Sequence, residues 1–110
     1  MTNQQNPYQL FQKEAPEVFD GFNHLVQSLI NTKALDEKMK QLIYIAMKIV
    51  ADDFKAVAFH VPMAKHAGAS REELRDTILL TLTVSGLKGI QLLGTVLELY
   101  DSAVDKSDRS

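Results

Sequence analysis

The sequence predicts an all-α fold of five to six helices, and three observations support this. Apolar residues recur at spacings of three and four along most of the 110 residues, which is the period of a helix with one buried face. Residues typical of helix starts and stops stand between these stretches. No alternating apolar and polar run is bounded by hairpin-turn residues, so strands are not expected. The length suits one core and one domain.

The domain is expected over residues 13–102, after a flexible Gln/Asn-rich lead-in over residues 1–12 and before a polar tail over residues 103–110. Pro16 is well placed in a first helical turn, and the helix that it opens should run to about Asn31. Its apolar positions follow helical spacing and are Val18, Phe19, Phe22, Leu25, Val26, Leu29 and Ile30.

A second helix should start at Asp36, whose carboxylate can cap it, with Glu37 in the first turn. Its apolar positions are Met39, Leu42, Ile43, Ala46, Met47, Ile49 and Val50. Asp52 and Asp53 break the pattern. A third helix should then cover about residues 54–66 and end at Gly68, a residue that favours helix C-termini.

Ser70 and Glu73 form the capping box S-x-x-E, which predicts the start of a fourth helix that runs to about Ser85. A fifth helix is expected over about residues 90–100. Apolar residues surround these last two helices almost completely, and a helix that is apolar all round must be buried all round. A small domain has few places to bury two such helices, so we expect a homo-oligomer.

The composition excludes several classes of function. The net charge is −2, and no basic stripe interleaved with aromatics indicates nucleic-acid binding. The chain has no cysteine, so it cannot form disulfides, thiolate metal sites or cysteine nucleophiles. No signal peptide is recognisable, and no stretch of about 20 cleanly apolar residues predicts a membrane span. A cytoplasmic protein without membrane or nucleic-acid partners is expected.

Residues 40–76 resemble the carboxymuconolactone decarboxylase family, which includes the alkylhydroperoxidase-D-like proteins. The resemblance lies in KQLIYIAMKIVA, in His60 with Ala64 and Gly68 four and eight residues further on, and in GASREEL. APEVFDGFNHLV and KALDEKMKQL match the usual lead-in, so the resemblance extends over about residues 14–100. It implies an all-α fold that assembles into trimers or hexamers.

The redox branch of that family uses C-x-x-C-x-x-x-H together with a glutamate on the preceding helix. Here the two cysteine positions hold Asp53 and Ala56, the histidine position holds His60 and the glutamate position holds Gln41. Only the histidine is retained, and the redox chemistry needs thiols. Peroxidase or antioxidant activity is therefore the least expected function. A redox protein that borrows thiols from a partner has no positive support.

The decarboxylase branch also lacks cysteines, acts on a carboxylated muconolactone and needs no metal. This chain departs from it, with Ala56 where an acidic residue is common and residues 84–86 where an aromatic residue and a glycine are usual. The resemblance implies a metal-independent activity of lyase or isomerase type, without a cofactor, on a small carboxylated or lactone-type substrate around His60. The alternative is a non-catalytic oligomeric binding or scaffold protein that has kept the fold.

His60 is the candidate catalytic residue. Ala56 and Ala64 lie on the same helical stripe and leave room above its ring, and an imidazole with an ordinary pKa near 6.5 suits acid–base chemistry or anion binding. The alternative is a partly buried histidine hydrogen-bonded to a carbonyl. His60 and His66 are six residues apart and point to different faces of the helix, so no metal site is expected.

Gln41, Tyr44 and Asp53 are the candidate substrate-binding residues. Gln41 would face His60 if the helices pack as in the family, and its amide could orient a carboxylate or the imidazole; a solvated position is the alternative. Tyr44 could offer its hydroxyl to the same pocket or simply pack in the core. Asp53 could line the pocket, although capping of the third helix is the simpler interpretation.

Overall fold

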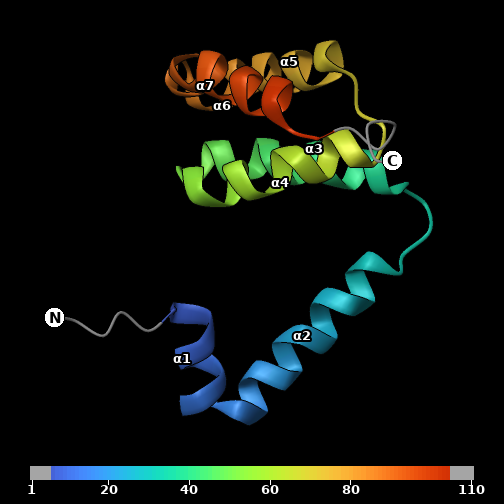
Figure 1. Ribbon diagram of the computed structural model, residues 1–110, viewed down its shortest axis with the longest axis vertical. Coiled ribbons are helices and arrows are strands. Elements are labelled where there is room, and N and C mark those ends of the chain that lie inside the picture. Colours follow the sequence, from blue (N-terminus) through green and yellow to red (C-terminus); the bar gives the residue numbers. More distant parts are fainter. Residues whose placement is uncertain (1–5, 105–110) are drawn as a thin grey trace, which may run out of the picture. The chain divides into compact units, whose positions relative to one another are not determined.

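The computed structural model describes residues 6–104, and these form seven helices and no strand (Figure 1). The helices are α1 (Pro7–Glu14), α2 (Pro16–Ile30), α3 (Glu37–Val50), α4 (Phe54–His66), α5 (Arg71–Leu80), α6 (Leu82–Ser85) and α7 (Lys88–Ser102). The prediction of an all-α fold is confirmed. The helices beyond the five predicted main ones are α1 and the single turn α6.

The helices fall into two compact units, with α1 and α2 within residues 1–34 and the other five within residues 35–110. The sequence suggested one domain over residues 13–102 and did not reveal this division. None of the described helices is long and apolar enough to cross a membrane.

The first unit differs from its prediction, because the flexible lead-in expected over residues 1–12 is a helix from Pro7 onward. The side chain of Asn6 caps this helix by accepting a hydrogen bond of 2.7 Å from the backbone N–H of Tyr8. Such a cap is local and readable in the sequence. Residues 1–5 of the expected lead-in lie outside the described part of the chain.

An aromatic cluster joins α1 to α2. Phe19 is buried, and the rings of Tyr8 and Phe11 meet it edge-on with centroid distances of 4.9 and 5.2 Å. The hydroxyl of Tyr8 also donates a 2.7 Å hydrogen bond to the side chain of Asn23. Edge-to-face packing of this kind stabilises more than its buried area alone, and it explains why a short polar segment is helical.

In the second unit, the predicted cap at the start of α3 is confirmed, because the carboxylate of Asp36 accepts a 2.8 Å hydrogen bond from the N–H of Met39. The predicted break between α3 and α4 is confirmed as well. After α3, Asp52 adopts the left-handed conformation with φ of +67°, which aspartate tolerates better than most residues. Asp53 then caps α4 by accepting a 3.2 Å hydrogen bond from the N–H of Ala56.

The connection between α4 and α5 also follows the sequence. Pro62 lies inside α4, and Gly68 follows the helix with a φ of +103°, a conformation that glycine adopts without steric cost. Both halves of the capping box are present at α5: Ser70 accepts a 3.0 Å bond from the N–H of Glu73, and the Glu73 carboxylate accepts a 2.9 Å bond from the N–H of Ser70.

Replacing Ser70 with alanine is expected to lower the free energy of unfolding by about 1 kcal/mol, because the N–H of Glu73 loses its partner. Urea denaturation followed by circular dichroism would measure the difference. Ser70→Asp should retain most of the stability, since aspartate caps helices as well as serine does. Equal stability of the alanine variant and the wild type would contradict this role.

The helix predicted to run to Ser85 is interrupted at Thr81. This residue is 3% exposed, and its hydroxyl donates a hydrogen bond of 2.6 Å to the carbonyl of Ile78. Only one further turn, α6, follows before α7 begins at Lys88, slightly earlier than predicted. Gly89, at the start of α7, lies directly against Thr81 and Ile49, and this close approach is a tertiary feature that the helical period does not reveal.

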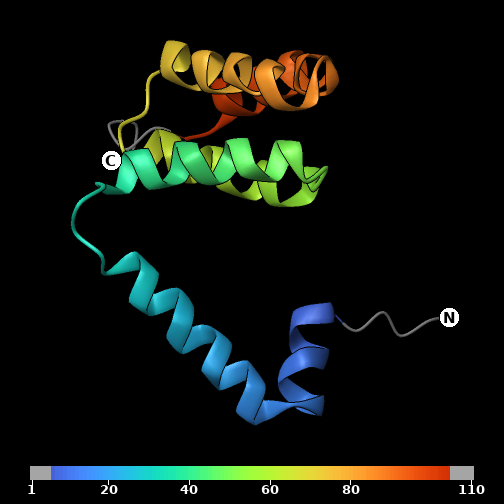
Figure 2. The same ribbon diagram turned by 180° about the vertical axis from the view of Figure 1, so that it is seen from behind.

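The second unit has two layers, one of α3 with α4 and one of α5, α6 and α7 (Figures 1 and 2). The core between and within these layers consists of Leu42, Ile45, Ile49, Val57, Val61, Ala64, Ala69, Leu74, Ile78 and Val96. The end of α7 is held by the Tyr100 hydroxyl, which donates to the Ala69 carbonyl at 2.7 Å, and by Lys65, whose ammonium donates to the carbonyls of Tyr100 and Ala103. The helix α7 ends at Ser102, and residues 105–110 of the polar tail expected over residues 103–110 lie outside the described part.

Candidate functional site

His60 lies on α4 and its imidazole faces α3. The His60 Nδ1 is 2.8 Å from the Oε1 of Gln41, and both side chains are half-buried. An amide oxygen only accepts hydrogen bonds, so this contact favours the neutral tautomer that carries its proton on Nδ1 and its lone pair on Nε2. The structure thus brings together His60 and Gln41, and the carbonyl oxygen that the imidazole contacts is that of the Gln41 side-chain amide.

Tyr44 completes this contact one turn further along α3. Its ring lies 4.3 Å from the imidazole of His60, measured between centroids, at an interplanar angle of 50°. The side chain is half-buried, so Tyr44 both packs between the helices and forms one wall of the site. The ring of Phe59 also meets the imidazole, edge-on with a centroid distance of 5.4 Å, and Phe59 is 70% exposed.

Asp53 is not at His60 but at the start of α4, where its carboxylate caps the helix and contacts Lys48. The carboxylate lies 3.3 Å from the Lys48 ammonium, and the Asp53 backbone N–H donates to the Lys48 carbonyl at 2.9 Å. Helix capping, the simpler interpretation of this residue, is what the geometry shows. A role of Asp53 in substrate binding stays a prediction.

Lys48 is the site residue that the sequence analysis missed. Its ammonium lies 5.4 Å from the centre of the Tyr44 ring, within the range of cation–π attraction. The signal was present in the spacing, since Gln41, Tyr44 and Lys48 follow one another three and four residues apart and therefore share one helix face. These residues, with His60 and Asp53, form what we call the α3–α4 seam.

The electrostatics of the seam favour a neutral imidazole. Partial burial lowers the pKa of His60, and the positive charge of Lys48 lowers it further. The hydrogen bond to Asp53 raises the pKa of Lys48, while the bonds from the Ala56 N–H and then from Lys48 lower the pKa of Asp53. Lys48 and Asp53 are thus both charged at neutral pH beside an uncharged base.

Replacing Lys48 with methionine is expected to raise the pKa of His60, because one of the two causes that lower it is removed. An NMR titration of the imidazole Cε1–H signal would measure the change, with the exposed Lys55→Met on α4 as the matched control. Identical His60 titrations in all three proteins would show that Lys48 does not act on the imidazole.

The same pKa shift has a consequence for stability. The folded-state pKa of His60 is below its ordinary value, so protons bind preferentially to the unfolded chain. The contribution of the neutral His60 to the free energy of unfolding is therefore fully present above about pH 6.5. It is lost as the pH falls through the folded-state pKa of His60. His60→Gln should flatten the loss of stability on this acid side, as urea denaturation at several pH values would show.

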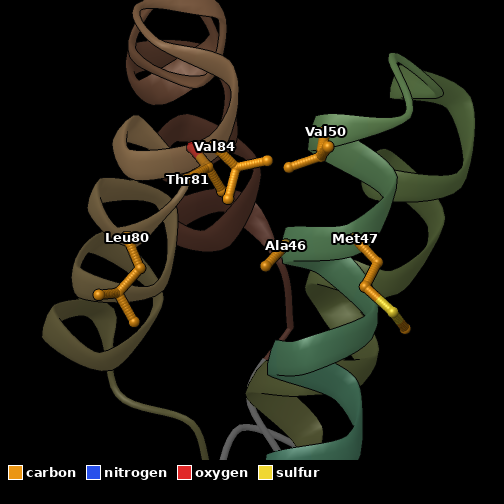
Figure 3. Close-up of a pocket in the computed structure, with 6 residues that line it drawn as sticks. All are labelled: Ala46, Met47, Val50, Leu80, Thr81 and Val84. Carbon is orange, nitrogen blue, oxygen red and sulfur yellow. The ribbon is translucent and has the colours of Figure 1, made fainter.

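Two hollows of about 360 Å³ each lie elsewhere in the second unit. The first is almost wholly apolar and lies between α3 and the end of α5 with α6 (Figure 3). It is lined by Ala46, Met47, Val50, Leu80, Thr81 and Val84. The second is lined by Glu37, Pro62, Met63, His66 and Val104. His60 lines neither of these hollows.

Comparison with known proteins identifies the family. The chain matches the model of the Carboxymuconolactone decarboxylase family over residues 16–93. It is also 27% identical over 92 residues to the uncharacterised protein MJ1511 of Methanocaldococcus jannaschii, an alignment that covers 83% of this chain and 86% of the relative. No solved structure matches significantly. Because the matched residues span well over half of the chain and include the α3–α4 seam, the protein belongs to the carboxymuconolactone decarboxylase family.

Proposed function

We propose that this protein is an enzyme acting on a small carboxylated or lactone-type substrate, with His60 as its general base. The observation that carries this proposal is the 2.8 Å contact between His60 Nδ1 and Gln41 Oε1. The contact orients the ring and selects the tautomer in which Nε2 can accept a proton. A base held in this way by a second group is the usual arrangement in acid–base catalysis.

The chemistry that fits this arrangement is proton transfer at a carbon beside a carbonyl group. Nε2 of His60 accepts the proton, and the bonding electrons move into the carbonyl group to form an enolate. The Gln41 oxygen, which accepts from Nδ1, stabilises the imidazolium that results. The protonated ring can then return the proton to the substrate, so the cycle needs neither thiol nor metal. The lowered pKa of His60 keeps the base unprotonated at neutral pH.

A ligand screen tests this proposal. We would record thermal stability and the His60 Cε1–H signal with small lactones, keto acids and dicarboxylates. A ligand that binds the folded state raises its stability by about 2.7 kcal/mol at a hundredfold excess over Kd. The expected result is a shift in the wild type that His60→Ala abolishes and His66→Ala retains. A shift lost only in His66→Ala would place the ligand in the second hollow and contradict the proposal.

A non-catalytic binding or scaffold protein is the second candidate function, and one observation favours it. His60 lines neither of the two hollows, whereas the first hollow is an apolar groove suited to protein contact. If no compound shifts the wild type and His60→Ala assembles as the wild type does, the scaffold function would replace the enzymatic one.

We also propose that the protein is a homo-oligomer, with the first hollow and its surroundings as the contact between copies. Leu80, Val84 and Leu87 are 67–71% exposed and Met47 is 56% exposed. Met47, Leu80 and Val84 line the same hollow, and a monomeric protein rarely exposes a large contiguous apolar surface. Residues 77–87 carry no charge, so two copies of this surface can meet without like-charge repulsion. The family resemblance further favours trimers or hexamers.

Sedimentation velocity of the wild type and of Val84→Lys tests the oligomer. The lysine would add a charge to every copy of the interface, so the wild type should sediment as an oligomer and the variant as a smaller species. Thr95→Lys, at an exposed position of α7, is the control that should leave the assembly intact. A monomeric wild type at micromolar concentration would contradict the proposal.

A further inference from the structure

We propose that the Lys48 ammonium is the group that binds the substrate carboxylate, and that Asp53 competes with the substrate for it. This inference rests on the proposed function, because it assigns the recognition of the acid group within the same seam. It adds a specificity-determining residue to the site and divides the seam into two parts. Lys48 holds the charged end of the substrate, and His60 acts on the carbon that loses its proton.

The position of Lys48 is the first support. Tyr44 is a common neighbour of both functional groups, with its ring 4.3 Å from the imidazole of His60 and 5.4 Å from the Lys48 ammonium. An aromatic ring that lies close to both a cation and a base can support the carbon skeleton of a small acid. The carboxylate then reaches Lys48 while the carbon beside the carbonyl group reaches Nε2 of His60.

The availability of Lys48 is the second support. An ammonium group has three N–H donors, and Asp53 is the one carboxylate within 4.0 Å of it among the described residues. The 3.3 Å separation is longer than the roughly 2.7–2.9 Å typical of charge-assisted hydrogen bonds. The side chains of Lys48 and Asp53 are 31% and 43% exposed, and such solvated ion pairs contribute little. A substrate carboxylate can therefore share or take the ammonium.

The role of Asp53 makes the competition testable. Its carboxylate is tied to the seam by the cap on α4 and by the backbone bond to Lys48, so it stays near the ammonium. Asparagine caps a helix as well as aspartate does but carries no charge. Asp53→Asn should thus preserve α4 while removing the competitor, and it should tighten the binding of an anionic substrate.

This assignment specifies the class of substrate. A cation at one end of the seam selects small acids, such as keto acids and lactone acids, over neutral lactones and esters of the same shape. We would use 5-oxotetrahydrofuran-2-carboxylate and its methyl ester as a matched pair of probes. The two differ by one charge and little volume, and their dissociation constants follow from the His60 Cε1–H signal.

The wild type is expected to bind the carboxylate at least tenfold more tightly than the ester. Lys48→Met should reduce this preference to near one, Lys48→Arg should keep most of it, and Lys55→Met should keep all of it. Asp53→Asn should bind the carboxylate severalfold more tightly than the wild type, with the ester unchanged. Circular dichroism of each variant confirms the helical fold.

Each other result overturns a defined part of the inference. A preference for the carboxylate that persists in Lys48→Met would exclude Lys48 as the binding group, while the response of His60 would leave the proposed function standing. Weaker binding by Asp53→Asn would show that Asp53 positions Lys48 and does not compete. If neither probe affects His60 in the wild type, both this inference and the proposed function fail for lactone acids.

Discussion

Replacing Gly89 with alanine is expected to lower the free energy of unfolding by about 1–3 kcal/mol, the range for an added group in a well-packed core. A Cβ atom at Gly89 would overlap the hydroxyl oxygen of Thr81 and lie 3.2 Å from Cγ2 of Ile49. Ile49 is fully buried and Thr81 is 3% exposed. Neither neighbour can move into solvent, so α7 must shift away from the core.

Gly94 is the matched control on the same helix. No atom lies within 4 Å of a Cβ added there, so Gly94→Ala should raise the free energy of unfolding by about 0.5–1 kcal/mol through helix propensity alone. Urea denaturation of both variants gives the comparison. Stabilisation by Gly89→Ala of the same size as by Gly94→Ala would show that α7 does not approach Thr81 closely.

A double-mutant cycle identifies the contact responsible. Thr81→Ala removes the hydroxyl that the new methyl group would meet, although it also removes the hydrogen bond to Ile78. The cost of Gly89→Ala should therefore be smaller in the Thr81→Ala background than in the wild type. Equal costs in the two backgrounds would assign the strain to Ile49 instead, since the cycle isolates the pairwise contribution.

Replacing His60 with glutamine is expected to reduce turnover about 10²–10⁴-fold on any substrate found by the ligand screen, the usual contribution of a general base. Glutamine keeps a polar side chain opposite Gln41 but cannot accept a proton near neutral pH. Rates of substrate consumption for the two proteins would be compared at saturating and at low substrate concentration. Because the base acts in the transition state, kcat should fall while KM changes little.

Two further variants separate chemistry from folding. His66→Gln changes an exposed histidine at the end of the same helix and should keep the full rate. Gln41→Leu removes the partner of Nδ1 and should lower kcat less than His60→Gln, since the base remains but its orientation is lost. A His60→Gln protein with unchanged turnover would exclude His60 as the base.

The boundaries of the helices were largely predictable because they depend on local hydrogen bonds. Asp36 and the Ser70–Glu73 box each bond to a backbone group three residues away, so their partners are readable from spacing. Gly68 ends the α4 region for a similarly local reason, its positive φ. The pairing of His60 with Gln41 was expected only from the family resemblance, because the two residues lie on different helices.

The tertiary structure decided the features that depend on residues distant in sequence. The helix α1 packs its rings on Phe19, and the break at Thr81 lies where Gly89 brings α7 against it. Helical period cannot reveal either contact, since it describes one helix at a time.

In the α3–α4 seam, too, some features followed from the sequence and others only from the tertiary structure. Residue types and spacing, together with the family resemblance, were sufficient to single out His60 as the candidate base. Composition alone excluded thiol chemistry, because a missing cysteine is a property of composition. Only the packing of α3 on α4 showed that Lys48 lies beside Tyr44 and that Asp53 pairs with it. Charges act through space, so the electrostatics of a site become known only when the helices that carry them are placed together.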